Sequence, residues 1–129
     1  MQFELEAKTV TAERAEFFWL VGFADDPVDT TEYLLLGRGF EDDEQSIRLG
    51  MATYHVEISG QGASCYGGLS TLDLQPGQLI LIFAPEGAAR LGCDQARITF
   101  DLSPDELHNL KDILRRVFAE SDVRTTGLG

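Results

Sequence analysis

The chain has 129 residues, with 22 acidic against 10 basic side chains and a net charge of −12 at pH 7. This length predicts one domain, and a hydrophobic content of 43% excludes intrinsic disorder. The acid excess argues against binding to nucleic acid or to an anionic membrane, because both surfaces attract Lys and Arg. A basic partner is favoured instead.

We expect a cytoplasmic protein. The first residues lack the positive region and apolar stretch of a signal peptide, and no apolar run is long enough to span a membrane. Cys65 and Cys93 stand far apart and outside any paired motif, which favours reduced thiols over a disulfide. We expect the domain to cover residues 1–120 and a flexible polar tail to cover 121–129.

The first half of the chain predicts four strands. Residues 2–8 alternate between apolar and charged, as in a half-buried strand. Residues 16–23 are apolar on both faces, which predicts a central strand covered at least in part on each side. Residues 33–36 form a shorter apolar strand. The strand at 51–59 directs alternate residues to opposite sides, with Tyr54, Val56 and Ile58 inward and Thr53, His55 and Glu57 outward.

Turns rich in Gly and Pro join the next strands. A turn at 60–62 leads into a strand from 65 to 74 that returns antiparallel to the preceding strand. A second turn at 75–78 leads into the most apolar strand of the chain, at 79–83. Residues 85–92 predict one or two helical turns that Gly92 closes, and residues 97–102 predict another strand.

One amphipathic helix closes the domain. Ser103 is a good N-cap, Pro104 suits the first helical position, and Glu106 completes a capping box. The apolar stripe comprises Leu107, Leu110, Leu114, Val117 and Phe118. The whole pattern predicts an α+β domain, with a curved, mostly antiparallel sheet of about seven strands and the C-terminal helix packed on one face.

Familiar catalytic motifs are incomplete. His55-Val56-Glu57 is similar to the His-x-Glu of zinc deaminases, but no Pro-Cys-x-x-Cys follows it. The glycines at 60–62 and 67–68 lack the Gly-Lys-Ser/Thr ending of a phosphate loop, so turns and bulges explain them better. His108 is expected on the surface. We therefore expect no metal and no cofactor.

The acidic residues are concentrated in one segment. Residues 25–44 carry eight acids against Arg38, a net charge of −7, and the remaining 109 residues carry only −5. Two clusters flank the strand at 33–36, and they comprise Asp25, Asp26, Asp29 and Glu32 before it and Glu41, Asp42, Asp43 and Glu44 after it. Such clusters either keep a domain soluble or dock a basic protein. Neither cluster has the spacing of a calcium loop.

Short segments through nearly the whole domain carry a resemblance by their order. They are Phe18–Asp25, Glu32–Leu36, Asp42–Gln45, Leu49–Met51, Tyr54–Glu57, Gln61-Gly62, Tyr66–Gly68, Ala88-Ala89, Leu91-Gly92, Ile98–Leu102 and the helix to Phe118. Together they resemble the immunity protein 10 family of bacterial polymorphic toxin systems. The resemblance implies a non-enzymatic antidote, made in the cytoplasm of the toxin producer, that binds and blocks a cognate toxin domain.

The resemblance supplies no catalytic or ligand residue, so contact residues are predicted physically. Toxin domains of such systems are often nucleases with basic grooves, which an acidic inhibitor can occupy as a phosphate mimic. We predict contact through the acidic residues of segment 25–44, with Tyr33 and Tyr66 as candidate aromatic anchors.

Two other classes of function stay open at the level of sequence. A small-molecule or cation-binding domain without catalysis requires a pocket of several hundred Å³, here lined by residues such as Trp19 and Tyr54. A hydrolase requires Cys65 and His55 within hydrogen-bond reach in a cleft.

Overall fold

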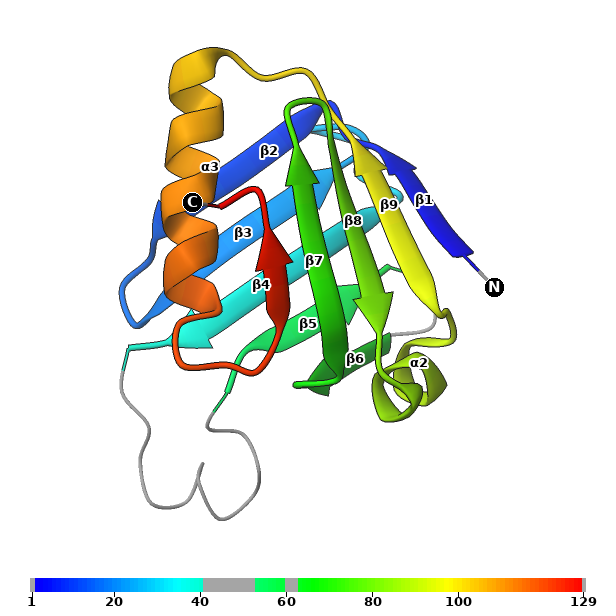
Figure 1. Cartoon of the computed structure of the whole chain (residues 1–129). Helices are drawn as coiled ribbons and strands as arrows, with labels where there is room; N and C mark the ends of the chain where they lie inside the picture. Colours follow the sequence, from blue (N-terminus) through cyan, green and yellow to red (C-terminus); the bar gives the residue numbers. More distant parts are fainter. Residues whose placement is uncertain (1, 41–52, 60–62, 129) are drawn as a thin grey trace.

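The computed structural model describes residues 2–40, 53–59 and 63–128, and these fold into a sandwich of two sheets (Figure 1). The chain is α+β, as predicted. The prediction of a single sheet of about seven strands is wrong, because the described residues form two sheets of five strands each. The predicted turn at 60–62 lies outside the described residues.

The first sheet has the strand order β1-β9-β8-β7-β10. Its members are β1 (Gln2–Glu6), β7 (Leu69–Gln75), β8 (Gln78–Phe83), β9 (Gln95–Thr99) and β10 (Arg124–Thr126). The two edge strands run parallel to their neighbours, β1 to β9 and β10 to β7, and the inner pairings are antiparallel. Strand β9 begins earlier and ends earlier than the pattern at 97–102 predicted.

The second sheet has the order β2-β3-β4-β5-β6, and every pairing in it is antiparallel. Its members are β2 (Thr9–Arg14), β3 (Phe18–Ala24), β4 (Tyr33–Gly39), β5 (His55–Ile58) and β6 (Ala63–Tyr66). Strand β2 was not predicted. The predicted orientation of β5 is confirmed, because Tyr54, Val56 and Ile58 are buried while His55 and Glu57 are half-buried.

Two glycines explain why one predicted strand is divided between the sheets. The expected strand at 65–74 ends as β6 in the second sheet and resumes as β7 in the first. Between them Gly67 and Gly68 have φ angles of 75° and 85°, a left-handed conformation that other residues rarely adopt. Periodicity alone does not show this change of sheet, since Cys65 and Leu69 are both buried.

Two helices, α2 (Pro85–Leu91) and α3 (Pro104–Val117), complete the described fold. The predicted capping box of α3 is confirmed, because Ser103 Oγ accepts from the Glu106 N–H at 3.2 Å and Glu106 Oε1 accepts from the Ser103 N–H at 3.0 Å. Helix α3 lies beside the first sheet and across the inner face of β2, β3 and β4 (Figure 1). Its buried side chains are Leu110, Ile113, Leu114 and Val117.

The expected polar tail is part of the fold instead. Strand β10 lies parallel to β7, and Val123 and Leu128 on either side of it are buried. The Leu128 carbonyl accepts a 2.6 Å hydrogen bond from Arg115 Nε on α3. The low periodicity of this segment hid the strand, because three residues are too few to show alternation.

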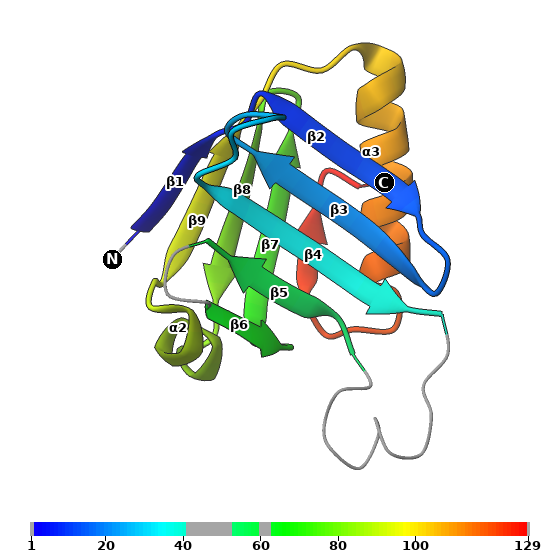
Figure 2. The same cartoon turned by 180° about the vertical axis from the view of Figure 1, so that it is seen from behind.

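The core lies between the two sheets and under α3, and none of the described helices or strands covers the outer face of either sheet. Figure 2 shows the second sheet from its outer side, with no helix in front of it.

Candidate protein-binding surface

The outer side of the second sheet, which we call the open face, combines apolar and acidic side chains. Its side chains are Thr9, Thr11, Glu13, Phe18, Leu20, Tyr33, Leu35, His55, Glu57, Ser64 and Tyr66. Phe18 and Tyr66 are 40% and 45% exposed. Arg14 and Arg38 are the arginines of these strands. Both are paired with Trp19, whose side chain is on the inner side and packs against the core, so both arginines are on the inner side as well. In the described part of these strands, the open face therefore carries no Lys or Arg.

The apolar character of β3 is now explained differently from the prediction. A strand that is apolar on both sides was expected to be covered, at least in part, on each side. Val21 and Phe23 are fully buried on the inner side, whereas Phe18 and Leu20 point to the uncovered side. Apolar residues on an uncovered sheet face are typical of a surface that another molecule covers.

A recess of about 340 Å³ lies in the open face. Its lining comprises Thr9, Thr11, Leu20, Gly22, Phe23, Ala24, Thr30, Tyr33, Leu35 and Glu57. Gly22 leaves room at its floor, where a Cβ atom would lie 3.0 Å from Cδ2 of Leu35. Sequence reasoning did not identify this recess, although apolar residues on both faces of the strand at 16–23 were a signal for it.

One carboxylate belongs to the recess. Glu57 Oε2 accepts a 2.8 Å hydrogen bond from the Tyr33 hydroxyl, and this bond raises the pKa of Tyr33. Glu57 makes no ion pair with any described residue. The negative charge of Glu57 is therefore oriented by Tyr33 but not neutralised.

The first acidic cluster forms the loop between β3 and β4. Asp25 accepts hydrogen bonds from the hydroxyl and, at 3.0 Å, from the N–H of Thr31. Asp26 Oδ1 accepts from the N–H groups of Val28 and Asp29, at 2.9 and 2.8 Å. These bonds lower the pKa values of both Asp25 and Asp26.

The remaining two acids of this cluster have a different role. Asp29 and Glu32 are exposed, and their carboxylates make no hydrogen bond or ion pair with the described residues. Asp25 and Asp26 thus stabilise the shape of the loop, and Asp29 and Glu32 present charge to the solvent.

The predicted contact residues that the structure describes lie in the acidic loop between β3 and β4 or on the open face. Tyr33 starts β4 directly after the acidic loop, and Thr30 of that loop lines the recess. Tyr66 is on the same face but at its β6 edge, where its ring centroid lies 4.7 Å from that of His55. The second acidic cluster, Glu41, Asp42, Asp43 and Glu44, lies outside the described residues.

The hydrolase hypothesis is wrong, because Cys65 and His55 are on opposite sides of the sheet. Cys65 stands opposite Val56 and is buried, whereas His55 stands opposite Tyr66 on the open face. Burial raises the pKa of the Cys65 thiol, which makes it a weak nucleophile. Within the described residues, no three His, Cys, Asp or Glu side chains form a metal-binding group.

Trp19 and Tyr54 do not share the predicted pocket, although Tyr54 lines a depression of about 510 Å³ without Trp19. Trp19 packs edge-on against Phe40 at 5.1 Å, with the guanidinium of Arg116 5.1 Å above its ring. Tyr54 packs 4.9 Å from Phe118, and its hydroxyl accepts from the Leu69 N–H at 2.9 Å. The two aromatic side chains therefore fill separate parts of the fold.

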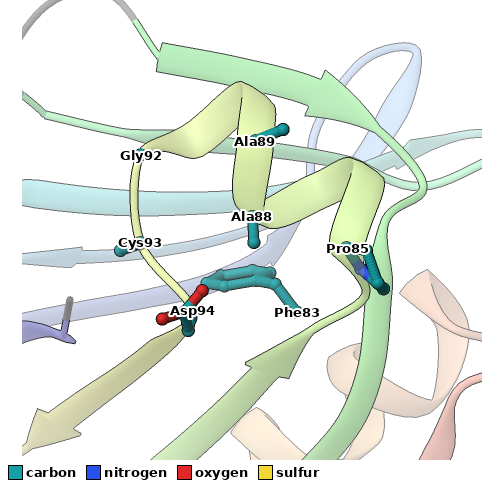
Figure 3. Close-up of a pocket in the computed structure, with 7 residues that line it drawn as sticks. All are labelled: Phe83, Pro85, Ala88, Ala89, Gly92, Cys93 and Asp94. Carbon is teal, nitrogen blue, oxygen red and sulfur yellow. The ribbon is translucent and has the colours of Figure 1, made fainter.

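Two further hollows are open depressions. One of about 490 Å³ lies under α2, where the Phe83 ring lies below Ala88 and close to Asp94 (Figure 3). The other, of about 510 Å³, is polar and includes Glu86, Asp122 and Arg124. In the first depression, burial raises the pKa of the Cys93 thiol, which makes it a weak nucleophile.

Comparisons with known proteins give one match. The family model of immunity protein 10 matches residues 6–108, from the end of β1 into α3. No curated protein and no solved structure gives a match. Among the described residues, no helix has the length and apolar character needed to cross a membrane.

Proposed function

This chain belongs to the immunity protein 10 family, and we propose that it binds a cognate bacterial toxin domain in the cytoplasm and covers the toxin's active surface. Proteins of this family are generally non-catalytic. Inhibition would therefore require a stable complex and no chemistry by the immunity protein.

The distribution of charge is the observation that carries the proposal. Segment 25–44 has a net charge of −7, and the described strands of the adjoining open face add Glu13 and Glu57 without any Lys or Arg. Charge of one sign on one side of a protein speeds association with a partner of the opposite sign. We propose that the toxin domain is basic, for example a nuclease whose substrate groove receives the acidic residues in place of phosphates.

The proposed contact residues flank β4 in the sequence or lie on the open face. They are Asp25, Asp26, Asp29, Glu32 and Tyr33 before or at the start of the strand, Glu41, Asp42, Asp43 and Glu44 after it, and Tyr66 at the edge of the open face. In this arrangement the acids steer the encounter, and the two tyrosines supply apolar contact area.

A binding titration tests the proposal. The toxin domain encoded beside this gene is purified in an inactive form and titrated against the chain, and the activity of the active toxin is measured with and without the chain. We expect one saturable complex, affinity that falls with added salt, and loss of toxin activity in the complex. Absence of binding at micromolar concentrations would falsify the immunity function.

A further inference from the structure

We infer that the recess in the open face binds an arginine side chain of the toxin, with its stem on the apolar floor and its guanidinium on Glu57. This inference rests on the proposed function and identifies where the interface has its centre. The recess lies among β2, β3, β4 and β5, on the side of the sheet that no other described helix or strand covers (Figure 2).

The lining of the recess matches both parts of an arginine side chain. Leu20, Gly22 and Leu35 form an apolar surface suited to the three methylene groups of the stem. Three threonines, Thr9, Thr11 and Thr30, and the carboxylate of Glu57 supply hydrogen-bond acceptors. An entirely aliphatic side chain would leave these polar groups without partners on the side it covered.

The charge of the recess favours a cation. Glu57 has no ion-pair partner among the described residues, and Tyr33 donates to only one of its oxygens. A carboxylate has about four acceptor positions, so Glu57 retains the capacity to accept from a guanidinium. Because the Tyr33 bond fixes its orientation, less side-chain freedom is lost when the cation binds.

The acidic loop connects this recess to the proposed steering surface. Thr30 lines the recess, and the same loop presents the unpaired carboxylates of Asp29 and Glu32 to solvent. A basic toxin attracted by the loop would therefore arrive next to the recess. Arginine is preferred over lysine because its planar group pairs with a carboxylate through two hydrogen bonds and is less strongly hydrated.

Two substitutions separate the charge of the recess from its shape. Glu57→Gln removes the charge and still provides an oxygen that accepts from Tyr33. Thr11→Trp fills the recess, because Thr11 is in register with Gly22 on the same face. The matched controls, Glu6→Gln and Thr71→Trp, change the same residue types in the strands of the first sheet.

Binding of each variant to the toxin domain encoded beside the gene is measured, and circular dichroism melting verifies that each variant is folded. We expect Glu57→Gln to weaken binding by about tenfold or more, since it leaves a toxin cation without its partner. Thr11→Trp should weaken binding at least as much, and the two controls should bind like the original chain. In the toxin, one Arg→Ala change should show a non-additive effect with Glu57→Gln.

Each other result overturns a different statement. If the original chain binds and both recess variants bind equally well, the recess is not the arginine site, although the immunity function stands. If only Thr11→Trp weakens binding, a neutral side chain occupies the recess and the arginine assignment is wrong. If the original chain itself does not bind, the proposed function fails and the inference fails with it.

Discussion

A Cβ atom on Gly87 would lie only 2.2 Å from the carbonyl oxygen of Gly68, so α2 and the turn after β6 are in direct backbone contact. The same carbonyl accepts a 2.8 Å hydrogen bond from the N–H of Ala84, just before α2. The contact lies where the chain passes from the second sheet to the first. Gly68 and Gly87 thus hold together the crossover on which the sandwich depends.

Gly87→Ala should therefore destabilise the protein, against the usual preference of helices for alanine. In an unobstructed helix the change would add about 1 kcal/mol to the free energy of unfolding, but the backbone clash should instead lower it by about 1–3 kcal/mol. Urea unfolding measures the difference. Gly77→Ala is the control, because its Cβ would meet nothing closer than the Phe100 carbonyl oxygen at 3.8 Å. A more stable Gly87→Ala variant would contradict the contact.

The sequence predicted those parts of the fold that depend on local pattern. The alternation in β1 and β5 and the capping box at Ser103 involve neighbouring residues, and all three are confirmed. The division into two sheets depends on the left-handed glycines at 67–68 and their contact with Gly87, which is distant in sequence. A pattern with a period of two cannot encode that contact.

The candidate surface was predicted only in part for a similar reason. The acidic clusters and Tyr33 are visible in the sequence, but the recess needs Thr11, Gly22 and Leu35 to come together from three strands. The apolar residues at both faces of β3 indicated a covered strand. Only the arrangement of the layers shows that one of those faces is open.

Leu128→Ala should show that the last residues belong to the fold. Leu128 is buried, and its carbonyl accepts from Arg115, so truncating the side chain should lower the free energy of unfolding by about 2–4 kcal/mol. Thermal or urea unfolding gives this value. The neighbouring Thr126→Ala serves as the control, because Thr126 is exposed. An unchanged unfolding midpoint for Leu128→Ala would contradict this prediction and favour the flexible tail that the sequence predicted for residues 121–129.

Glu106 should make the stability of α3 depend on pH. Hydrogen bonds from Ser103 lower the pKa of Glu106 below its ordinary value of 4.5. Since the folded state prefers the charged form, this stabilisation is complete above pH 4.5 and is lost as the pH falls through the lower folded value. The free energy of unfolding of Glu106→Gln should accordingly decrease less on acidification. Urea unfolding over a series of pH values measures this dependence, and a slope equal to that of the original chain would contradict it.

The two cysteines should react slowly in the folded protein. Burial raises the pKa values of Cys65 and Cys93, so few thiolates are available and access to them is poor. A thiol reagent such as DTNB should label both only on unfolding. His55→Ala should leave the labelling rate of Cys65 unchanged, because the imidazole is on the other side of the sheet. A slower reaction in His55→Ala would indicate an activated cysteine.

Neutralising the exposed acids should slow the encounter with the toxin without affecting the fold. Asp29→Asn with Glu32→Gln removes two charges that make no internal contact, so the association rate should fall several-fold at low salt and depend less on salt. Urea unfolding should be unchanged. Stopped-flow mixing over a series of salt concentrations measures the rate.

The other acids provide the comparison that separates steering from loop structure. Asp26→Ala removes the acceptor of two backbone N–H groups and should also lower the free energy of unfolding. Replacing Asp42, Asp43 and Glu44 with Asn, Asn and Gln should slow association, as the Asp29→Asn and Glu32→Gln changes do. If one cluster can be neutralised with no change in association rate, that cluster does not face the toxin, and the basic surface of the toxin meets the other end of β4.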